Sequence, residues 1–140
     1  FEYLWKRHQA GLLKTEFTQS LGKVAYQVPC HLRVQNIGLK TRDVLKLVPE
    51  TTFEVIERCT GHDGTYAIKK EFRPNAMKIG KPAARQLNAA GKKHVVSECP
   101  LAGIHIEQEI DQLASETPKP ERVAHPIVLM ARAYGFDDRS

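Results

Sequence analysis

The chain has 140 residues, of which 41% are hydrophobic and 26% charged, a composition typical of one globular domain with its own core. Its formal net charge is +5, but basic and acidic residues are interspersed and no aromatic residues accompany a basic stripe, so we expect no nucleic-acid partner. The longest uninterrupted apolar run covers residues 127–131, far short of the ~20 residues that span a membrane. The three cysteines are an odd number, which argues against a disulfide framework and for a reducing, cytoplasmic location.

The N-terminal part differs from the rest of the chain. Apolar residues recur at helical spacing over residues 1–14, which predicts an amphipathic helix, and a polar connector follows over 15–22. Because the chain starts at Phe1 inside this helix, we expect a fragment or processed piece of a longer protein. We therefore divide the chain into an N-terminal helix and connector (1–22) and one cysteine-rich α/β domain (23–140).

Strand and helix patterns alternate along the second part. Runs rich in β-branched residues predict strands over 23–29, 51–58, 93–98 and 122–124. Between and after them we expect helices over 42–48, capped by Thr41; over 66–72, broken at Pro74; from Pro82 to Ala90, stopped by Gly91; from Pro100; and from Pro126, closed by Gly135. This alternation predicts an α/β fold, a doubly wound sheet of about four parallel strands covered by helices, as in flavodoxin and Rossmann domains.

The three cysteines share one topological position. Cys30, Cys59 and Cys99 each follow a predicted strand, and His125 follows the fourth. Parallel strands end at one edge of the sheet, where α/β domains place their sites. A single cysteine there is most often a small buried residue, but three in the same position favour a shared site.

The neighbours of the cysteines fit metal-ligand chemistry. Cys99 would cap the helix opened by Pro100, and a helix N-terminus favours the thiolate that binds metal. Gly61 and Gly64 permit positive φ angles, so backbone N–H groups can point at a bound anionic group. Histidines flank the same edge of the sheet, namely His31, His62 and His105. A Cys59–His62 thiol enzyme is a second reading of these residues, because the i, i+3 spacing in a turn permits contact.

Four blocks of the sequence resemble a known family: "VPCHLRVQNIGLKT" (28–41), "RCTGHDGTYAIKKE" (58–71), "SECPLAGIHIE" (97–107) and "AHPIVLMARAYG" (124–135). Together they resemble the C-terminal cysteine-rich, CCG-type domain of heterodisulfide-reductase-related iron–sulfur oxidoreductases. The small subunit of anaerobic glycerol-3-phosphate dehydrogenase is a more distant resemblance. The four blocks cover nearly the whole chain and occur in the family's order.

The family pattern has five cysteines, and this chain keeps three of them. The "PCH" block is intact at Cys30, the "CCG" block reads Cys59-Thr60-Gly61, and the terminal "CxxC" block begins at Cys99 and ends at Ala102. A five-thiolate noncubane cluster is therefore excluded. The resemblance implies an iron–sulfur cluster, with a cubane [4Fe–4S] type expected, a [3Fe–4S] type also open, and zinc or no metal as the alternatives.

Three thiolates leave one position of a cubane cluster open. His62 is the favoured fourth ligand because its turn already lies beside Cys59, and His31 and His125 follow. We thus expect Cys30, Cys59, Cys99 and His62 to bind the metal, and Gly61 and Gly64 to shape the cofactor-binding loop.

The resemblance also implies a larger redox assembly. Family members are usually longer and carry an upstream ferredoxin-like region, which we expect to be missing here. The expected partners are iron–sulfur or flavin redox subunits, which can hold the protein at a membrane surface. The resulting hypothesis is an electron-transfer domain of an oxidoreductase, against a cluster-free scaffold that docks a redox partner.

Overall fold

A computed structural model describes residues 1–90, 92–114, 116–120 and 122–136. The four strands are β1 (Gly22–Gln27), β2 (Thr51–Ile56), β3 (His94–Ser97) and β4 (Val123–Ala124). The helices are α1 (Glu2–Gln9), α2 (Cys30–Gln35), α3 (Lys40–Leu45), α4 (Arg73–Ala89), α5 (Pro100–Asp111) and α6 (Pro126–Ala133), with a 3₁₀ turn, η1, at Tyr66–Ile68.

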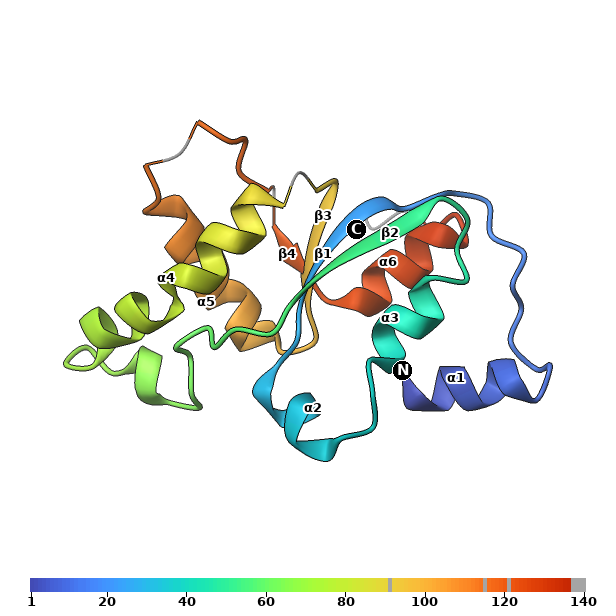
Figure 1. The fold of residues 1–140 in the computed structure, drawn as a ribbon, viewed down its shortest axis with the longest axis horizontal. Helices are drawn as coiled ribbons and strands as arrows, with labels where there is room; N and C mark the ends of the chain where they lie inside the picture. Colours follow the sequence, from blue (N-terminus) through green and yellow to red (C-terminus); the bar gives the residue numbers. More distant parts are fainter. Residues whose placement is uncertain (91, 115, 121, 137–140) are drawn as a thin grey trace.

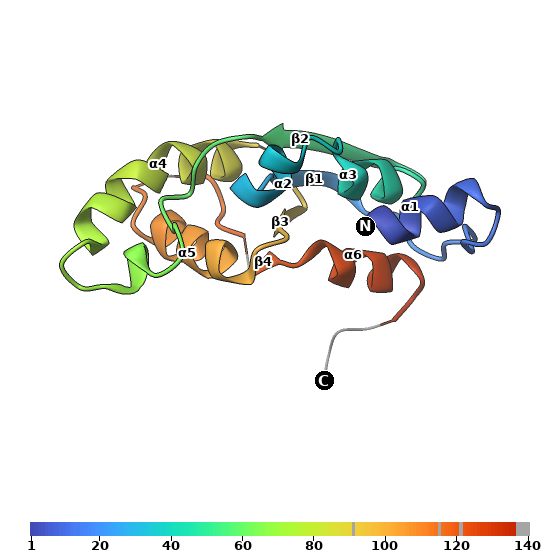
Figure 2. The same cartoon turned by 90° about the horizontal axis from the view of Figure 1, so that it is seen from below.

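The strands form one sheet in the order β2-β1-β3-β4, and all neighbouring pairs are parallel. β1 lies in the centre, where Gly22 pairs with Thr51 of β2 and Val24 pairs with His94 of β3. α3 packs on one face between β1 and β2, whereas α4 and α5 cover the other face on the way back to β3 and β4 (Figures 1 and 2). The α/β fold with a doubly wound parallel sheet is therefore confirmed.

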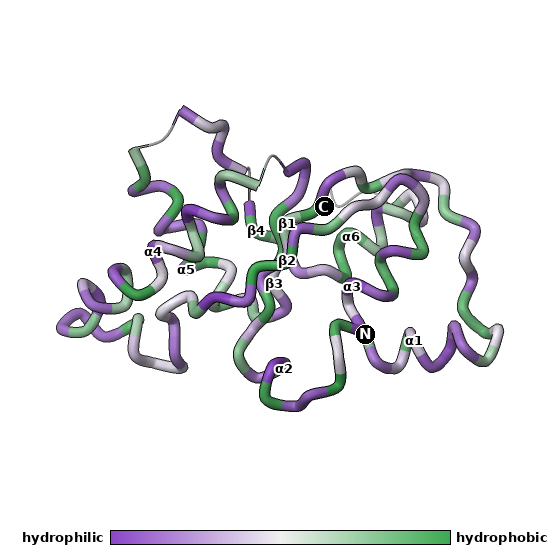
Figure 3. The backbone as a smooth tube through the Cα atoms, viewed as in Figure 1, coloured by the Kyte–Doolittle hydropathy of each residue, from purple (hydrophilic) through white to green (hydrophobic). Residues whose placement is uncertain are grey.

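Alternation along β1 divides the core into two layers. Val24 and Tyr26 face α3 and α6, whereas Ala25 faces α4 and α5. Hydrophobic residues accordingly concentrate along the central strands (Figure 3). The α3–α6 layer also contains the large fully buried side chains Leu21, Leu45 and Leu129, and the α4–α5 layer contains Leu87, Ile106 and Ile110.

Helix α4 corrects two expectations about proline. We expected a helix to break at Pro74 and another to begin at Pro82, but α4 runs through both positions. Pro74 lies in the first turn, where the missing N–H would have no helical partner. Pro82 lies inside the helix, on its exposed side. The helix continues past this proline because Ala83, Ala84 and Leu87 are all fully buried against the sheet.

Other predicted boundaries also differ from the structure, among them the helix expected over residues 66–72, of which only the 3₁₀ turn Tyr66–Ile68 forms. The first helix ends at Gln9 rather than residue 14, and Gly11 follows it with a φ of +68°. Thr41 does not cap α3: Leu39 precedes the helix, and the buried Thr41 hydroxyl instead donates a hydrogen bond to Glu98. The predicted helix stop at Gly91 lies outside the described residues. No helix among the described residues is both long and apolar enough to cross a bilayer.

Candidate functional site

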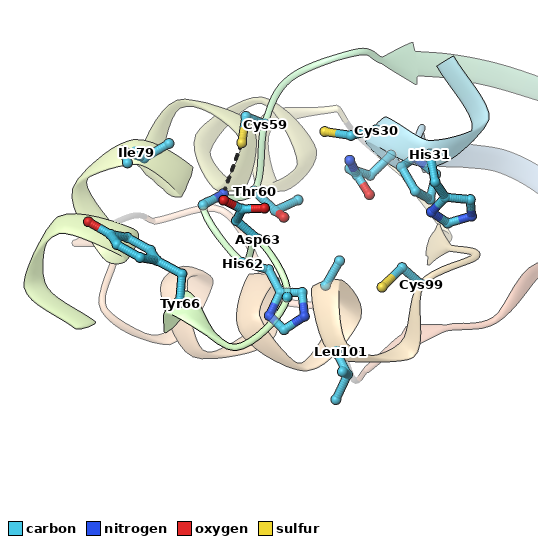
Figure 4. Close-up of a pocket in the computed structure, with 15 residues that line it drawn as sticks. Cys30, His31, Cys59, Thr60, His62, Asp63, Tyr66, Ile79, Cys99 and Leu101 are labelled. Atoms are coloured by element: carbon cyan, nitrogen blue, oxygen red, sulfur yellow. Dashed lines mark hydrogen bonds between the residues drawn. The ribbon is translucent and has the colours of Figure 1, made fainter. Parts of the chain in front are cut away.

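All three cysteines line one cavity of about 590 Å³ at the carboxyl ends of the strands. Cys30 is the first residue of α2, Cys59 lies in the loop after β2, and Cys99 is the N-cap residue of α5. Cys30 and Cys99 point their sulfur atoms toward the loop that carries Cys59 (Figure 4). The cavity lies where β1 and β3 are neighbours although they are not consecutive in the chain, which is the switch point of a doubly wound sheet.

The walls of the cavity are mixed in character. Pro29, Ile79, Leu101 and Ala102 supply apolar surface, and the loop after β2 supplies polar groups that include Asp63. Cys30 and Cys59 are exposed and Cys99 is partly exposed. The thiols are thus accessible from solvent, while apolar walls surround them on the protein side.

Gly61 fixes the path of the Cys59 loop. Its backbone N–H donates a hydrogen bond to Cys59 Sγ with an N···S distance of 3.3 Å (Figure 4). Its φ is +74°, and an added Cβ would overlap the carbonyl oxygen of Ala76 in α4. Only glycine fits this position. Gly64 has a φ of +57°, but no atom of the described residues lies within 4 Å of an added Cβ. Glycine is favoured there by the backbone conformation and not by close packing.

A buried polar pair lies beneath the thiols. Gln27 and Ser97 are each 1% exposed, and the Ser97 hydroxyl donates to Gln27 Oε1 at 2.8 Å. The Gln27 amide donates to the carbonyl oxygens of Val28 at 2.8 Å and Arg58 at 3.3 Å, and Ser97 Oγ accepts the Cys99 N–H at 3.4 Å. Our sequence analysis missed this pair, although a polar residue inside the apolar run "KVAYQVP" was a usable signal.

His62, the expected fourth ligand, lies at the cavity that the three cysteines line. It lines the cavity and is 8% exposed. Burial and the neighbouring His105 lower the pKa of His62 below its ordinary value, although Asp63 opposes this shift. A neutral imidazole is the form that binds metal. His31 also lines the cavity.

His105 and His125, which the sequence analysis placed at this edge of the sheet, do not line the cavity. His105 is 3% exposed, lies behind His62 at 6.4 Å between ring centroids, and faces Glu109 with His105 Nε2 3.4 Å from Glu109 Oε1. Within the described part of the chain, neither that nitrogen nor either Glu109 oxygen has a well-aligned hydrogen-bond partner. His125 caps α6, and its Nδ1 accepts the N–H of Ile127 at 3.1 Å.

The electrostatics of the thiols favour a protonated Cys30 in the metal-free protein. Burial and the adjacent Cys59 thiol raise the pKa of Cys30, and Arg33 opposes them only in part. Metal binding at Cys30 must therefore displace a proton. Among the described residues, no three Cys, His, Asp or Glu side chains come together as they would around a single ion. The set of metal ligands thus stays a prediction.

Thr60 and Ala102 also line the cavity, and they are 6% and 5% exposed. They occupy the two positions at which the resemblance described above expects further cysteines. All five positions of that pattern therefore face the same space, and this chain fills two of them with side chains that cannot act as thiolate ligands.

Comparisons with known proteins show the family of this chain. The profile of the cysteine-rich domain family CCG matches residues 24–107. A component of the anaerobic glycerol-3-phosphate dehydrogenase of Escherichia coli K12 is 33% identical over 133 residues, which cover 94% of this chain and 31% of that protein. An uncharacterized iron–sulfur protein of Methanocaldococcus jannaschii is 34% identical over 110 residues, covering 77% of this chain and 22% of the relative.

A third relative is a component of the fumarate reductase (CoM/CoB) of Methanothermobacter marburgensis, which is 29% identical over 119 residues, covering 82% of this chain and 23% of the relative. No solved structure gives a significant match. The chain spans less than a third of the length of these curated relatives. The profile match extends from β1 into α5 and includes all three cysteines, and the chain belongs to the CCG cysteine-rich domain family.

Proposed function

We propose that this domain binds an iron–sulfur cluster and transfers electrons within a larger oxidoreductase. The observation that carries the proposal is the presence of three thiols from three separate loops around one cavity. Relatives named as an iron–sulfur protein and as components of two oxidoreductases support it. Cysteine thiolates are the usual ligands of such clusters.

The proposed ligands are Cys30, Cys59 and Cys99, with His62 as the fourth. A [4Fe–4S] cluster fits best, because each thiolate can bind its own iron atom. A single zinc ion needs all ligands within about 2.3 Å of one centre, and the described side chains do not converge in that way. Zinc therefore remains the alternative, and binding it would require the ligand side chains to move closer together.

The residues around the thiols have distinct roles in this proposal. The Gly61 N–H stabilises a thiolate at Cys59, because it already donates to that sulfur. Burial keeps His62 neutral and available as a ligand. Ile79 and Leu101 supply apolar surface beside the thiols. When bound, the cluster would supply one-electron redox chemistry, and the chain would supply its ligands and orientation.

The partner of the domain follows from the same proposal. Because the chain covers only 31% of the E. coli relative, we propose that it works with iron–sulfur or flavin redox subunits or domains, including a ferredoxin-like one. A cluster at a solvent-accessible cavity suits electron exchange with such a partner. Any attachment to a membrane would then come through that partner.

Anaerobic purification followed by iron, sulfide and zinc analysis tests the proposal. We expect stoichiometric iron and sulfide in the wild type, and loss of most of the iron in Cys30→Ser, Cys59→Ser and Cys99→Ser. His62→Ala should keep part of the iron and change the electron paramagnetic resonance spectrum of the reduced protein. His8→Ala, outside the cavity, is the matched control and should behave as the wild type.

Two results would contradict the cluster. Stoichiometric zinc without sulfide would establish the zinc site. A colourless, stable protein without metal, after expression with a full supply of iron, would establish the cluster-free scaffold. A Cys59 alkylation rate that depends on His62 without metal would support the thiol enzyme.

A further inference from the structure

The hydrogen bonds of the Gln27–Ser97 pair reach the backbone at each of the three cysteine loops. Val28, whose carbonyl accepts from Gln27, lies two residues before Cys30. Arg58, the second acceptor, immediately precedes Cys59. The third loop is reached through Ser97, which accepts the N–H of Cys99 itself.

The Gln27–Ser97 pair lies at the carboxyl end of the sheet, in the last residue pairs of β1 with β2 and β3. Gln27 pairs with Ile56 of β2 on one side and with Ser97 of β3 on the other. β1 is central, so one side chain can reach the ends of all three strands that precede cysteines. The glutamine amide donates to two carbonyl oxygens through Nε2 and accepts from the Ser97 hydroxyl through Oε1, which a side chain with a single polar atom could not do.

Stability alone does not require a polar pair here. Buried polar groups cost free energy that their hydrogen bonds only offset, and apolar side chains of similar shape can replace both partners at little net cost. Hydrogen bonds differ from apolar contacts because they fix direction and distance. A satisfied buried network therefore specifies one arrangement of the strand ends.

We propose that Gln27 and Ser97 are positioning residues that hold Cys30, Cys59 and Cys99 at fixed separations around the cavity. The use of that geometry for a cluster rests on the proposed function, but the geometry itself does not. It exists in the metal-free protein, because every bond that carries it is between protein atoms.

Bridging of thiols in the metal-free, reduced 140-residue chain tests this proposal. Dibromobimane joins two neighbouring thiols, whereas monobromobimane reports the reactivity of each thiol alone. In Gln27→Leu/Ser97→Ala we expect the bridging rate between loops to fall about tenfold or more, because small misplacements of reacting groups have large effects on rate. The rate with monobromobimane should stay close to that of the wild type, and the variant should remain folded with a lower thermal midpoint, because the backbone groups of Val28, Arg58 and Cys99 lose their side-chain partners.

Ser97→Ala alone keeps the test decisive if the double variant does not fold. It should slow the bridging of Cys99 to Cys59 and leave Cys30–Cys59 bridging unchanged, since the Gln27 bonds to Val28 and Arg58 remain. Ser20→Ala/Gln35→Leu, a matched exposed pair, should bridge as the wild type does.

Unchanged bridging in both Gln27–Ser97 variants would overturn the proposal, and so would a wild type that shows no bridging. Iron analysis separates this result from the proposed function. If the wild type binds no iron but its bridging still depends on Gln27 and Ser97, the positioning role stands and the cluster does not. Slower bridging with retained folding, together with a shifted cluster potential in Ser97→Ala, would support both.

Discussion

The two layers of the domain contain similar apolar cores but very different polar groups. Leucines and valines fill the core of the α3–α6 side, and its partly buried acceptor, Glu98, receives hydrogen bonds from Tyr26 and Thr41. The α4–α5 side contains glycines in close contact with backbone, and it contains the His105–Glu109 pair, to which the described residues offer no aligned hydrogen-bond partner. The cysteine loop that follows β2 packs on this second side. We infer that both apolar layers supply stability and that the α4–α5 layer in addition shapes the site.

Gly61→Ala should cause the largest loss of stability, and it tests the contact between the Cys59 loop and the α4–α5 side. The added Cβ would overlap the Ala76 carbonyl, at a φ of +74° that already disfavours side chains. We expect a loss of about 4 kcal/mol in the free energy of unfolding, from overpacking and left-handed strain together. Urea denaturation measures it.

Gly64→Ala is the matched control for Gly61. It shares the positive φ, +57°, but has open space around the added Cβ, so only the strain of about 1 kcal/mol should remain. Equal costs at the two glycines would mean that the contact of the Cys59 loop with α4 does not constrain the loop.

Leucine truncation on each side should show that the apolar cores are equivalent. Leu87 of α4 and Leu129 of α6 are both fully buried. Leu87→Ala and Leu129→Ala should therefore each cost about 3 kcal/mol, the transfer term plus a cavity term. A much smaller cost for Leu87 in chemical denaturation would contradict the equivalence, and would make the α4–α5 layer the weaker one throughout.

These contrasts show how far the sequence could predict the molecule. The alternation of strand and helix patterns predicted the sheet, and the position of each cysteine after a predicted strand indicated that the three cysteines lie near one another, because a parallel topology brings strand ends together. Pro82 inside α4 and the Thr41–Glu98 bond were not predictable locally, because packing of a distant element decides them. The Gln27–Ser97 pair depends on the register of β1 and β3, which no single segment contains.

Glu109 should give the α4–α5 side a pH dependence that its exposed neighbours lack. Burial raises the pKa of the Glu109 carboxyl above its ordinary value, and His105 offsets this only in part. The folded state therefore holds the proton more tightly than the unfolded state. Its stabilising contribution is complete below the unfolded pKa and is lost as the pH rises through the raised pKa of the folded protein.

Glu109→Gln should remove that loss, so that the free energy of unfolding of the variant exceeds that of the wild type increasingly as the pH rises. His62 gives the opposite slope, because its lowered pKa makes stability fall as the pH drops below the ordinary histidine pKa. The difference in the free energy of unfolding between Glu109→Gln and the wild type, measured across pH, therefore isolates the contribution of Glu109. Asp111→Asn, at an exposed site, should leave the slope unchanged, and a Glu109→Gln curve parallel to the wild type would exclude a raised pKa.

Tyr26→Phe should have the smallest effect, and it tests the polar contact on the α3–α6 side. The Tyr26 hydroxyl donates to Glu98 Oε2 at 2.5 Å, and Thr41 donates to the other carboxylate oxygen. Phenylalanine keeps the apolar packing and removes one of the two donors, so we expect a loss of about 1 kcal/mol. Tyr3→Phe, at a side chain that is 68% exposed, should change nothing. Glu98 immediately precedes Cys99, so this variant also tests how Cys99 is positioned. Slower bridging of Cys99 in Tyr26→Phe would mean that both layers position this cysteine. Unchanged bridging would restrict that role to the α4–α5 side.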